Sequence, residues 1–323
     1  MCGIIGYVGG KQAYPIVIKG LHRLEYRGYD SAGIAIGLQN EINIYKQAGK
    51  VSDLEAFAQE GNINGSIGIG HTRWATHGPP NQINAHPHTS GDNTLALIHN
   101  GIIENYDSLK KALIKKGHTF ESETDTEVLI HLIEEIKNHE KVSLFEAVRL
   151  ALNEVVGAYA ILALDKENNE EMIAARKGSP LVIGLGKGEY FVASDATPIV
   201  EYTRNVVYLE DEQIARINKN EELEIKTISN IKKTPYIDEL ELSLEAIEKE
   251  GYEHFMLKEI FEQPKCILDT MRGRISSKSG EITLGGILDY EKKILNAERI
   301  IIVACGTSWH AGLIGEYLFE DLA

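Results

Sequence analysis

Apolar residues recur along the chain with two periods, which separate expected strands from expected helices. Continuous or alternating apolar runs predict strands that cluster at both ends of the first 228 residues. Their expected ranges are Cys2 to Gly9, Ser31 to Gly37, Ile67 to Gly70, Leu95 to Ile98, Ala158 to Leu164, Met172 to Ala175, Leu181 to Leu185, Tyr190 to Ala193, Val206 to Leu209 and Gln213 to Ile217. Apolar spacings of three and four predict helices at Ile16 to Leu24, Tyr106 to Lys116, Thr124 to Lys137 and from Ser143, where Glu146 has capping-box spacing. This order indicates stacked sheets covered by helices, a layered α+β domain.

The pattern changes after Ile217. Residues 218–250 are acidic and rich in lysine, which predicts an edge hairpin followed by a surface linker. Helices are expected at His254 to Met271 and Trp309 to Leu322, and Arg299 to Ala304 reads as a short buried strand. We therefore expect a first domain over residues 1–228, a linker over 229–250 and the beginning of an α/β domain over 251–323.

Composition narrows the class of protein. The chain has 323 residues, of which 43% are hydrophobic and 25% charged, as in ordinary globular proteins. Its net charge of −15 makes nucleic acid and anionic membrane surfaces poor partners. The longest apolar run, Ile300 to Cys305, is too short to span a bilayer, and we find no signal-peptide pattern. Three cysteines far apart form neither a disulfide framework nor a zinc site, so a cytoplasmic location is expected.

Cys2 directly follows the initiator methionine. Removal of Met1 would place a thiol and a free α-amine on one residue. An α-amine with a pKa of about 7.7–8.0 is partly neutral at pH 7 and can accept the thiol proton. Cys2 is therefore a candidate nucleophile with its own base. Taken alone, however, it is more typical of a small apolar residue at the start of a buried strand.

The stretch from His99 to Ile103 contains Asn100-Gly101 and has two interpretations. Asn-Gly between apolar runs is typical of a type I′ hairpin turn, which the dipeptide alone favours. Alternatively, the Asn100 side-chain amide and the Gly101 backbone N–H could converge on a carbonyl oxygen as an oxyanion hole. A helical pattern begins soon afterwards and leaves little room for a return strand, which weakens the turn.

Histidines gather between residues 71 and 88, at His71, His77, His86 and His88. No cysteine or HExxH pattern accompanies them and the nearby prolines predict a loop, so we expect no metal there. Arg73, Thr76 and His77 of this loop offer a bidentate fork and neutral donors, which suit a carboxylate. Trp74 is either a core aromatic or a lid over a small ligand, and by itself the core is favoured.

Two further positions keep two interpretations each. Thr124 and Glu127 have the spacing of a capping box, so Asp125 either complements a helix dipole or pairs with a ligand ammonium. The residues after the expected strand at 299–304 suit a phosphate or an ordinary helix N-cap. They are Cys305, Gly306, Thr307 and Ser308.

Six motifs follow one another in a specific order: Cys2 to Gly6, Tyr26 to Gly33, His71 to Gly78, Asn84 to His88, His99 to Gly101 and Ser122 to Glu127. In this order the chain resembles the class II glutamine amidotransferases. The resemblance implies an N-terminal-nucleophile hydrolase fold with four layers, αββα. More narrowly, the chain is similar to the isomerizing glutamine–fructose-6-phosphate aminotransferase family. That match also includes Gly178 to Gly184 and Ala304 to Ser308.

The resemblance also implies a role for each matching residue. Cys2 would attack the side-chain carbonyl of L-glutamine, and Asn100 and Gly101 would form the oxyanion hole. Asp125 would bind the α-ammonium group. Three residues would hold the α-carboxylate: Arg73, Thr76 and His77.

Other residues would support this site. Trp74 would gate the passage of ammonia, and His86 would order the loop at the glutamine site. Arg27 and Gly28 would order the terminus that carries the nucleophile. The resemblance implies no cofactor and no metal.

The resemblance to this family stops early in its second half. There, sugar-isomerase domains convert fructose 6-phosphate and ammonia into glucosamine 6-phosphate, and residues 251–323 resemble only the start of the first one. We therefore expect a truncated form or fragment that hydrolyses glutamine but uses fructose 6-phosphate only with a complete isomerase domain. The full-length family is expected to form homodimers. The alternatives are another class II amidotransferase, such as the phosphoribosyl-diphosphate enzyme, and a catalytically idle partner.

Overall fold

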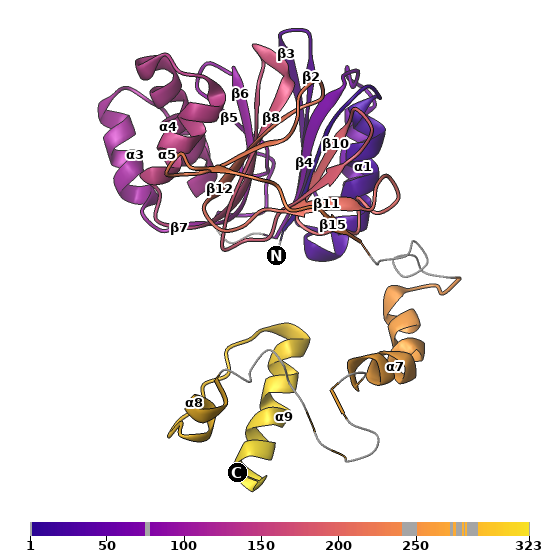
Figure 1. Cartoon of the computed structure of the whole chain (residues 1–323). Coiled ribbons are helices and arrows are strands. Elements are labelled where there is room, and N and C mark those ends of the chain that lie inside the picture. Colours follow the sequence, from indigo (N-terminus) through magenta and orange to yellow (C-terminus); the bar gives the residue numbers. More distant parts are fainter. Residues whose placement is uncertain are drawn as a thin grey trace. The chain divides into compact units, whose positions relative to one another are not determined.

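The computed structural model describes residues 2–74, 78–240, 251–271, 274–275, 280, 282 and 290–322. The chain divides into two compact units, Met1–Glu248 and Lys249–Ala323. The first unit holds two antiparallel sheets between helices, as Figure 1 shows.

The first sheet has eight strands. In spatial order they are β15 (Asp238–Glu239), β11 (Asn205–Tyr208), β9 (Val182–Leu185), β10 (Tyr190–Ala193), β1 (Gly3–Val8), β4 (Ile67–Arg73), β2 (Ser31–Leu38) and β3 (Glu41–Ala48). The N-terminal strand thus lies inside the sheet, between β4 and β10. In register, Gly3 is opposite Thr72 of β4, so the residue before Gly3 reaches the end of that strand.

The second sheet has seven strands. They are β14 (Lys232–Lys233), β13 (Glu224–Thr227), β12 (Gln213–Asn218), β8 (Asn168–Lys177), β7 (Gly157–Asp165), β6 (Leu95–Ile103) and β5 (His88–Thr89). β6 pairs with β7 near one edge of this sheet, with Asn100 opposite Ala160 and Gly101 opposite Tyr159.

Helices cover the outer face of each sheet. The helices α1 (Ala13–Leu24) and α2 (Val51–Ala58) pack on the first sheet. On the second sheet lie α4 (Asp125–Glu140) and α5 (Leu144–Asn153), and α3 (Tyr106–Lys115) packs against α4. This is the expected four-layer αββα arrangement, seen edge-on in Figure 1.

Three apolar clusters fill the spaces between the layers, and β1 contributes to two of them. Ile4 and Val8 face the second sheet, whereas Ile5 and Tyr7 face the helical layer of α1. Because successive side chains of a strand point to opposite faces, a strand buried on both faces reads as a continuous apolar run. This burial explains why the sequence pattern located β1 correctly.

β3 and α2 are the longest of the elements that the sequence interpretation missed. The edge strand β3 is only half buried, so its polar residues mask the alternation. The helix α2 has eight residues and buries three of them, Val51, Leu54 and Ala58, which is too short a stretch for a clear helical period.

Of the predicted capping box at Ser143, one half forms: Ser143 accepts from the Glu146 N–H, while the Glu146 side chain pairs with Arg149 instead.

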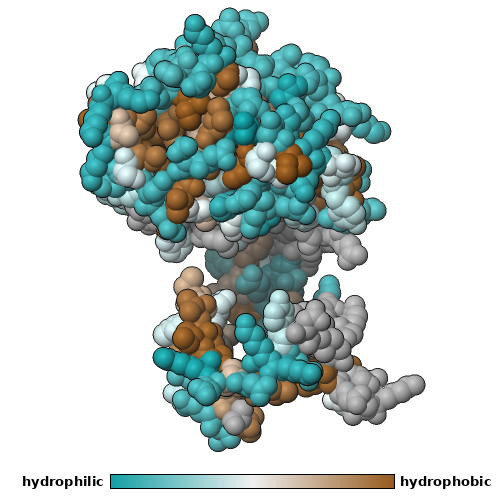
Figure 2. Space-filling view, turned by 60° about the vertical axis from the view of Figure 1, so that its left-hand side comes forward, coloured by the Kyte–Doolittle hydropathy of each residue, from teal (hydrophilic) through white to brown (hydrophobic). Residues whose placement is uncertain are grey.

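The second unit contains α7 (Phe255–Met271), α8 (Glu291–Leu295) and α9 (Gly306–Leu322). The strand expected at Arg299 to Ala304 is wrong: this segment has no regular structure. Within the described part of the chain no strand pairs with it, and an unpaired strand leaves its N–H and C=O groups without partners. Its apolar residues Ile300 to Val303 are exposed, and Figure 2 shows hydrophobic residues at the surface of this unit.

Candidate active site

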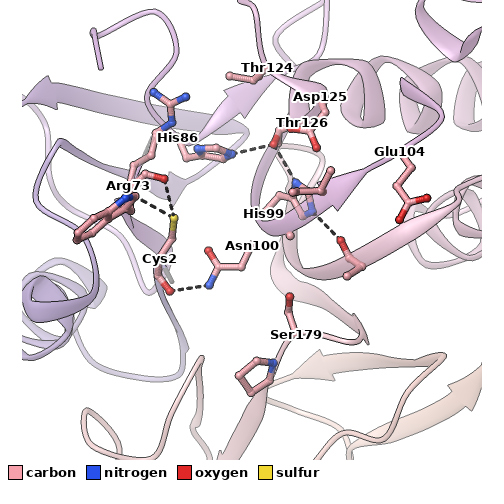
Figure 3. Close-up of a pocket in the computed structure, with 15 residues that line it drawn as sticks. Cys2, Arg73, His86, His99, Asn100, Glu104, Thr124, Asp125, Thr126 and Ser179 are labelled. Atoms are coloured by element: carbon pink, nitrogen blue, oxygen red, sulfur yellow. Dashed lines mark hydrogen bonds between the residues drawn. The ribbon is translucent and has the colours of Figure 1, made fainter. Parts of the chain in front are cut away.

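A pocket of about 460 Å³ lies where β1 and β4 of the first sheet approach β6 of the second sheet and the N-terminus of α4. Its lining residues are Cys2, Arg73, Trp74, His86, His99, Asn100, Gly101, Ile102, Glu104, Thr124, Asp125, Thr126, Ala158, Ser179 and Pro180. Figure 3 shows Cys2 and Arg73 on one side of this pocket, with Asp125 and Glu104 across from them. Segments more than 170 residues apart in sequence therefore meet at one site.

The position of Cys2 is fixed by hydrogen bonds on both sides. The next two residues anchor the strand, because Gly3 N donates to Thr72 Oγ1 (3.1 Å) and Ile4 N donates to Ser194 Oγ (3.1 Å). The thiol itself accepts a hydrogen bond from Trp74 N at 3.1 Å. Burial raises the pKa of the Cys2 thiol, and the Trp74 N–H offsets only part of this effect. A protonated thiol needs a base before it can attack a carbonyl carbon.

Gly28 lies directly behind this contact. A Cβ atom on Gly28 would lie 2.7 Å from the carbonyl carbon of Arg73 and 3.0 Å from Trp74 N. Asp30 N donates to Arg73 O (3.1 Å), which holds the same segment from the other side. Only a glycine leaves room for the peptide that binds the sulfur, and this gives Gly28 a packing role next to the Cys2 side chain.

Asn100 points at Cys2. Its Nδ2 donates to the carbonyl oxygen of Cys2 at 2.8 Å, as Figure 3 shows. Its Oδ1 lies 2.9 Å from Nε2 of His71, which also lies 3.1 Å from the carbonyl oxygen of His99. Since both neighbours of this nitrogen are acceptors, Nε2 carries the proton and the amide orientation is fixed.

The hairpin-turn interpretation of Asn100-Gly101 is wrong. Both residues lie inside β6, which continues to Ile103. Gly101 has a φ of +139°, and a Cβ atom there would collide with the carbonyl oxygen of Ala158 on β7. Glycine is required here by the close approach of two strands and not by a turn.

Arg73 and Asp125 are buried charged residues that line the same pocket. The guanidinium of Arg73 donates to the carbonyl oxygens of Pro79 (3.3 Å) and Gly78 (3.4 Å). Burial lowers the pKa of Arg73, and the nearby Cys2, Asp30 and Asp125 counteract this effect. Opposite charges at two ends of a small pocket suit a ligand that carries both a carboxylate and an ammonium group.

Asp125 lies where both interpretations of the sequence placed it, in the first turn of a helix and on the wall of the pocket. It is the first residue of α4, and its Oδ2 accepts from Ile103 N at 2.8 Å while the side chain lines the pocket. The expected capping box is half formed, since Thr124 Oγ1 accepts from Glu127 N at 3.3 Å. The Glu127 carboxylate instead accepts from Ser122 N and Glu121 N, because the preceding loop brings these N–H groups closer.

Three of the four histidines form a buried cluster. The predicted loop is wrong for two of them, because His71 lies in β4 and His88 in β5. The ring of His86 lies 4.3 Å from that of His71 and 4.9 Å from that of His88. Burial lowers the pKa of His71 and of His88 to about 3, and that of His86 well below its ordinary value. His86 and His88 bond Thr126 Oγ1 (2.9 Å) and Thr124 Oγ1 (3.0 Å) through Nε2. These rings are therefore neutral supports of the pocket.

Trp74 lies at the rim of the pocket. Its side chain is 47% exposed, so the core interpretation is wrong. The ring of Tyr29 packs edge-on against it, with the centroids 5.3 Å apart. Thr76 and His77 lie outside the described residues. Of Arg27, the structure describes the backbone at the end of a short 3₁₀ helix, Glu25–Arg27.

The sequence interpretation missed several lining residues. Thr126 Oγ1 also contacts Nδ1 of His99 at 3.0 Å, so one hydroxyl joins two histidines. Glu104, Ser179 and Pro180 line the pocket as well. A signal existed for three of them, although no role followed from it: Thr126 belongs to the motif Ser122 to Glu127, and Ser179 and Pro180 belong to the motif Gly178 to Gly184.

The candidate phosphate residues belong to the second unit. Gly306, Thr307 and Ser308 form the first turn of α9, which begins three residues earlier than expected. They are exposed, as is Cys305, which precedes the helix.

Comparisons with known proteins agree with this geometry. A family model described as a glutamine amidotransferase domain matches residues 52–253. The chain is 62% identical over 322 residues to the isomerizing glutamine–fructose-6-phosphate aminotransferase of Bacteroides thetaiotaomicron, covering 99% of this chain and 52% of that protein. The enzyme of the same name from Chlorobaculum tepidum is 54% identical, with 100% of this chain and 53% of that protein covered. The chain thus spans about half the length of the curated relatives it matches.

A solved structure shares the fold. The glutamine phosphoribosylpyrophosphate amidotransferase from B. subtilis, complexed with ADP and GMP, superimposes with a TM-score of 0.61 and 32% identity. The match covers 71% of this chain and 50% of that one. Among the described residues, no helix has the length and apolar character needed to cross a bilayer.

Proposed function

Because the chain belongs to the glutamine amidotransferase family, we propose that its first unit hydrolyses L-glutamine to glutamate and ammonia with Cys2 as the nucleophile. One observation carries this proposal: the Asn100 amide nitrogen lies 2.8 Å from the backbone carbonyl of Cys2, on the same pocket as the thiol. A donor for a developing negative charge thus stands next to the nucleophilic sulfur.

Removal of Met1 would supply the base. The α-amine of Cys2 accepts the thiol proton, and the sulfur attacks the side-chain carbonyl carbon of glutamine. Negative charge then develops on the carbonyl oxygen, where Asn100 Nδ2 and the N–H of Gly101 stabilise it. Burial raises the pKa of the thiol, which is why the reaction depends on this base.

The tetrahedral intermediate collapses when the carbon–nitrogen bond breaks. The protonated α-amine returns its proton to the leaving nitrogen, and ammonia departs while a thioester forms on Cys2. Water then attacks the thioester, with the same amine as base, and releases glutamate and the free thiol. Each proton taken by the amine is returned, so the enzyme is unchanged.

Charged groups of the pocket would orient the substrate. We assign the α-carboxylate of glutamine to Arg73 with Thr76 and His77, and the α-ammonium group to Asp125. The support for this assignment is the burial of Arg73 and Asp125 on the wall of the same pocket.

The remaining assignments are proposals of the same kind. Trp74 at the rim would gate ammonia, His86 would order the glutamine-site loop, and Arg27 and Gly28 would order the nucleophile's terminus. Gly28 has the support of its close packing against Arg73 and Trp74.

We further propose that this half-reaction supplies ammonia for aminosugar synthesis from fructose 6-phosphate, in a homodimeric protein. The support is the identity of 62% to the Bacteroides aminotransferase, of which the chain spans 52%. The proposed domains are a glutaminase domain over residues 1–228, a linker over 229–250 and the start of a sugar-isomerase domain over 251–323. In this last domain, Cys305 to Ser308 would contribute to the site for the sugar phosphate. The break between the two units after Glu248 supports this division, while β14 and β15 join residues 232–239 to the sheets of the first unit.

Mass spectrometry of the intact chain tests the proposed function directly. A glutamine analogue that alkylates thiols is expected to add once, on a Cys2 that has lost Met1, and glutamine is expected to block the addition. Ammonia release from glutamine is measured on the same sample. Ammonia release by a chain that retains Met1 would overturn the proposal.

A further inference from the structure

Three side chains outside the pocket of Cys2 bring their ligand atoms together. Nδ1 of His118 lies 3.2 Å from Nδ1 of His131. Oε2 of Glu134 lies 3.2 Å from His131 Nδ1 and 3.5 Å from His118 Nδ1. Among the residues that the structure describes, no other set of three or more His, Cys, Asp or Glu side chains comes this close.

The size of this triangle matches a metal site. Zinc bonds of about 2.0–2.1 Å at tetrahedral angles separate neighbouring ligand atoms by about 3.3–3.4 Å. The three measured separations, 3.2, 3.2 and 3.5 Å, lie close to this edge length. Ordinary hydrogen bonds account for two of the sides, but they do not require all three atoms to be equidistant.

The backbone holds the three residues in place. His118 follows α3, where Gly117 N donates to Ile114 O (3.0 Å) and His118 N donates to Leu113 O (3.1 Å). These two bonds, with a φ of +100° at Gly117, form a Schellman cap that fixes the start of the next segment. His131 and Glu134 are three residues apart on α4 and thus share one face of the helix.

Carboxylates stand behind both rings. Oε2 of Glu135 lies 3.1 Å from Nε2 of His118, and Oε1 of Glu127 lies 3.9 Å from Nε2 of His131. The other oxygen of Glu134 accepts from Asp92 N at 3.0 Å. Metal-binding histidines typically donate their second N–H to a carboxylate, which orients the ring and leaves the first nitrogen free for the metal.

We propose that His118, His131 and Glu134 bind one Zn²⁺ ion through Nδ1, Nδ1 and Oε2. Two imidazoles and a carboxylate are ligands that zinc accepts, and water would fill the fourth corner. The ion would join the segment after α3, the helix α4 and the turn at Asp92. Since Asp125 begins α4, the ion would stabilise the helix that forms part of the candidate active site.

Zinc titration of the full chain tests this proposal. After treatment with a chelator, isothermal titration calorimetry with Zn²⁺ is expected to show saturable binding of one ion per chain. His118→Ala removes a ligand from a partly exposed segment and is expected to weaken binding by more than about 100-fold. Glu135→Gln removes only the carboxylate behind the ring and is expected to weaken it by about 10–100-fold.

A matched control lies on the same helix. His139 is exposed and pairs with Glu140, so His139→Ala is expected to bind zinc as the unchanged chain does. With Co²⁺ in place of zinc, the visible absorption typical of tetrahedral coordination is expected in the unchanged chain and absent in His118→Ala. Lack of saturable binding, or equal binding by His118→Ala, would overturn the proposal. If His118→Ala does not fold, Glu135→Gln tests the proposal in its place, and zinc binding equal to that of the unchanged chain would overturn it. None of these measurements uses glutaminase activity, so the outcome is independent of the proposed function.

Discussion

The two walls of the pocket are built in different ways. On the first wall, which comes from the first sheet, the Cys2 sulfur is held by a backbone N–H of Trp74, and Gly28 allows this contact. On the second wall, which comes from the second sheet and α4, the Asn100 amide is held by a side chain, that of His71.

This difference shows what each wall requires of the sequence. The first wall needs a glycine at position 28, because a Cβ atom there would lie 2.7 Å from the carbonyl carbon of Arg73 and 3.0 Å from the Trp74 N that binds the sulfur. The second wall needs a hydrogen-bond partner for each buried polar side chain, because a buried polar or charged group without a partner costs several kcal/mol. His88 of β5 bonds Thr124 Oγ1, and His71 reaches Asn100 Oδ1 from β4 of the first sheet. Burial lowers the pKa of both rings to about 3, so both are neutral.

The largest expected effect comes from the sulfur of the first wall. Cys2→Ala is expected to abolish ammonia release from glutamine, because no other group can form the thioester. An N-terminal tag that is not cleaved is expected to do the same, since an amide nitrogen is not a base. The measurement is a coupled ammonia assay.

Two other cysteines provide matched controls. Cys266 and Cys305 are exposed, so Cys266→Ala and Cys305→Ala are expected to keep full glutaminase activity. Substantial turnover by Cys2→Ala would show that the first wall does not carry the nucleophile.

The next effect comes from the second wall. Asn100→Ala removes one oxyanion donor and is expected to lower kcat by about 10²–10³ with little change in KM. The steady-state rates of glutamine hydrolysis measure this. A loss of only a few-fold would mean that Asn100 has a structural role in β6 alone.

A smaller effect is expected when the packing behind the sulfur changes. Gly28→Ala places a methyl group 2.7 Å from the Arg73 carbonyl carbon, and overpacking of this kind costs about 1–3 kcal/mol. Chemical denaturation is expected to show this loss of stability together with reduced turnover. Gly10→Ala is the control, because no atom lies within 4 Å of its added Cβ. Equal stability of the two variants would contradict the tight packing of the first wall.

The last expected effect comes from pH and needs no substitution. Because burial holds the pKa of His71 and His88 at about 3, these rings remain neutral across the neutral range. Between pH 5 and 8, kcat/KM for glutamine is expected to rise with a single ionisation, that of an α-amine at about 7.7–8.0. The neutral amine is the active form, so activity falls as pH decreases. A second ionisation near 6.5 in the pH profile would show that one of these histidines carries charge.

Much of the fold could be predicted from periodicity. The ranges of β1, β2 and α4 agree with the sequence interpretation within a few residues, because their apolar positions are buried. β3 and α2 could not be found, since one is a half-buried edge strand and the other is short. The segment at Arg299 to Ala304 shows the opposite error: an apolar run predicts a strand only if another strand is present to pair with it.

Some features of the candidate site could likewise be predicted from the sequence, and others could not. Cys2, Arg73 and the glycine next to Asn100 could be selected from the sequence as candidate site residues, because their possible chemistry is evident in the residue types and their order. The amide-orienting bond from His71 and the hydroxyl of Thr126 between two histidines could not, because each joins residues 27 or more apart.

The sequence by itself determined the layered architecture and the type of chemistry available, since both follow from residues close together along the chain. The tertiary structure decided that Asn100 and Gly101 lie within a strand, that Trp74 lies at a rim, and that Asp125 faces the same pocket as Arg73. It also formed the cluster of His118, His131 and Glu134. The reason is that hydrophobic periodicity is local, whereas the separation of two polar groups depends on how the sheets and helices pack.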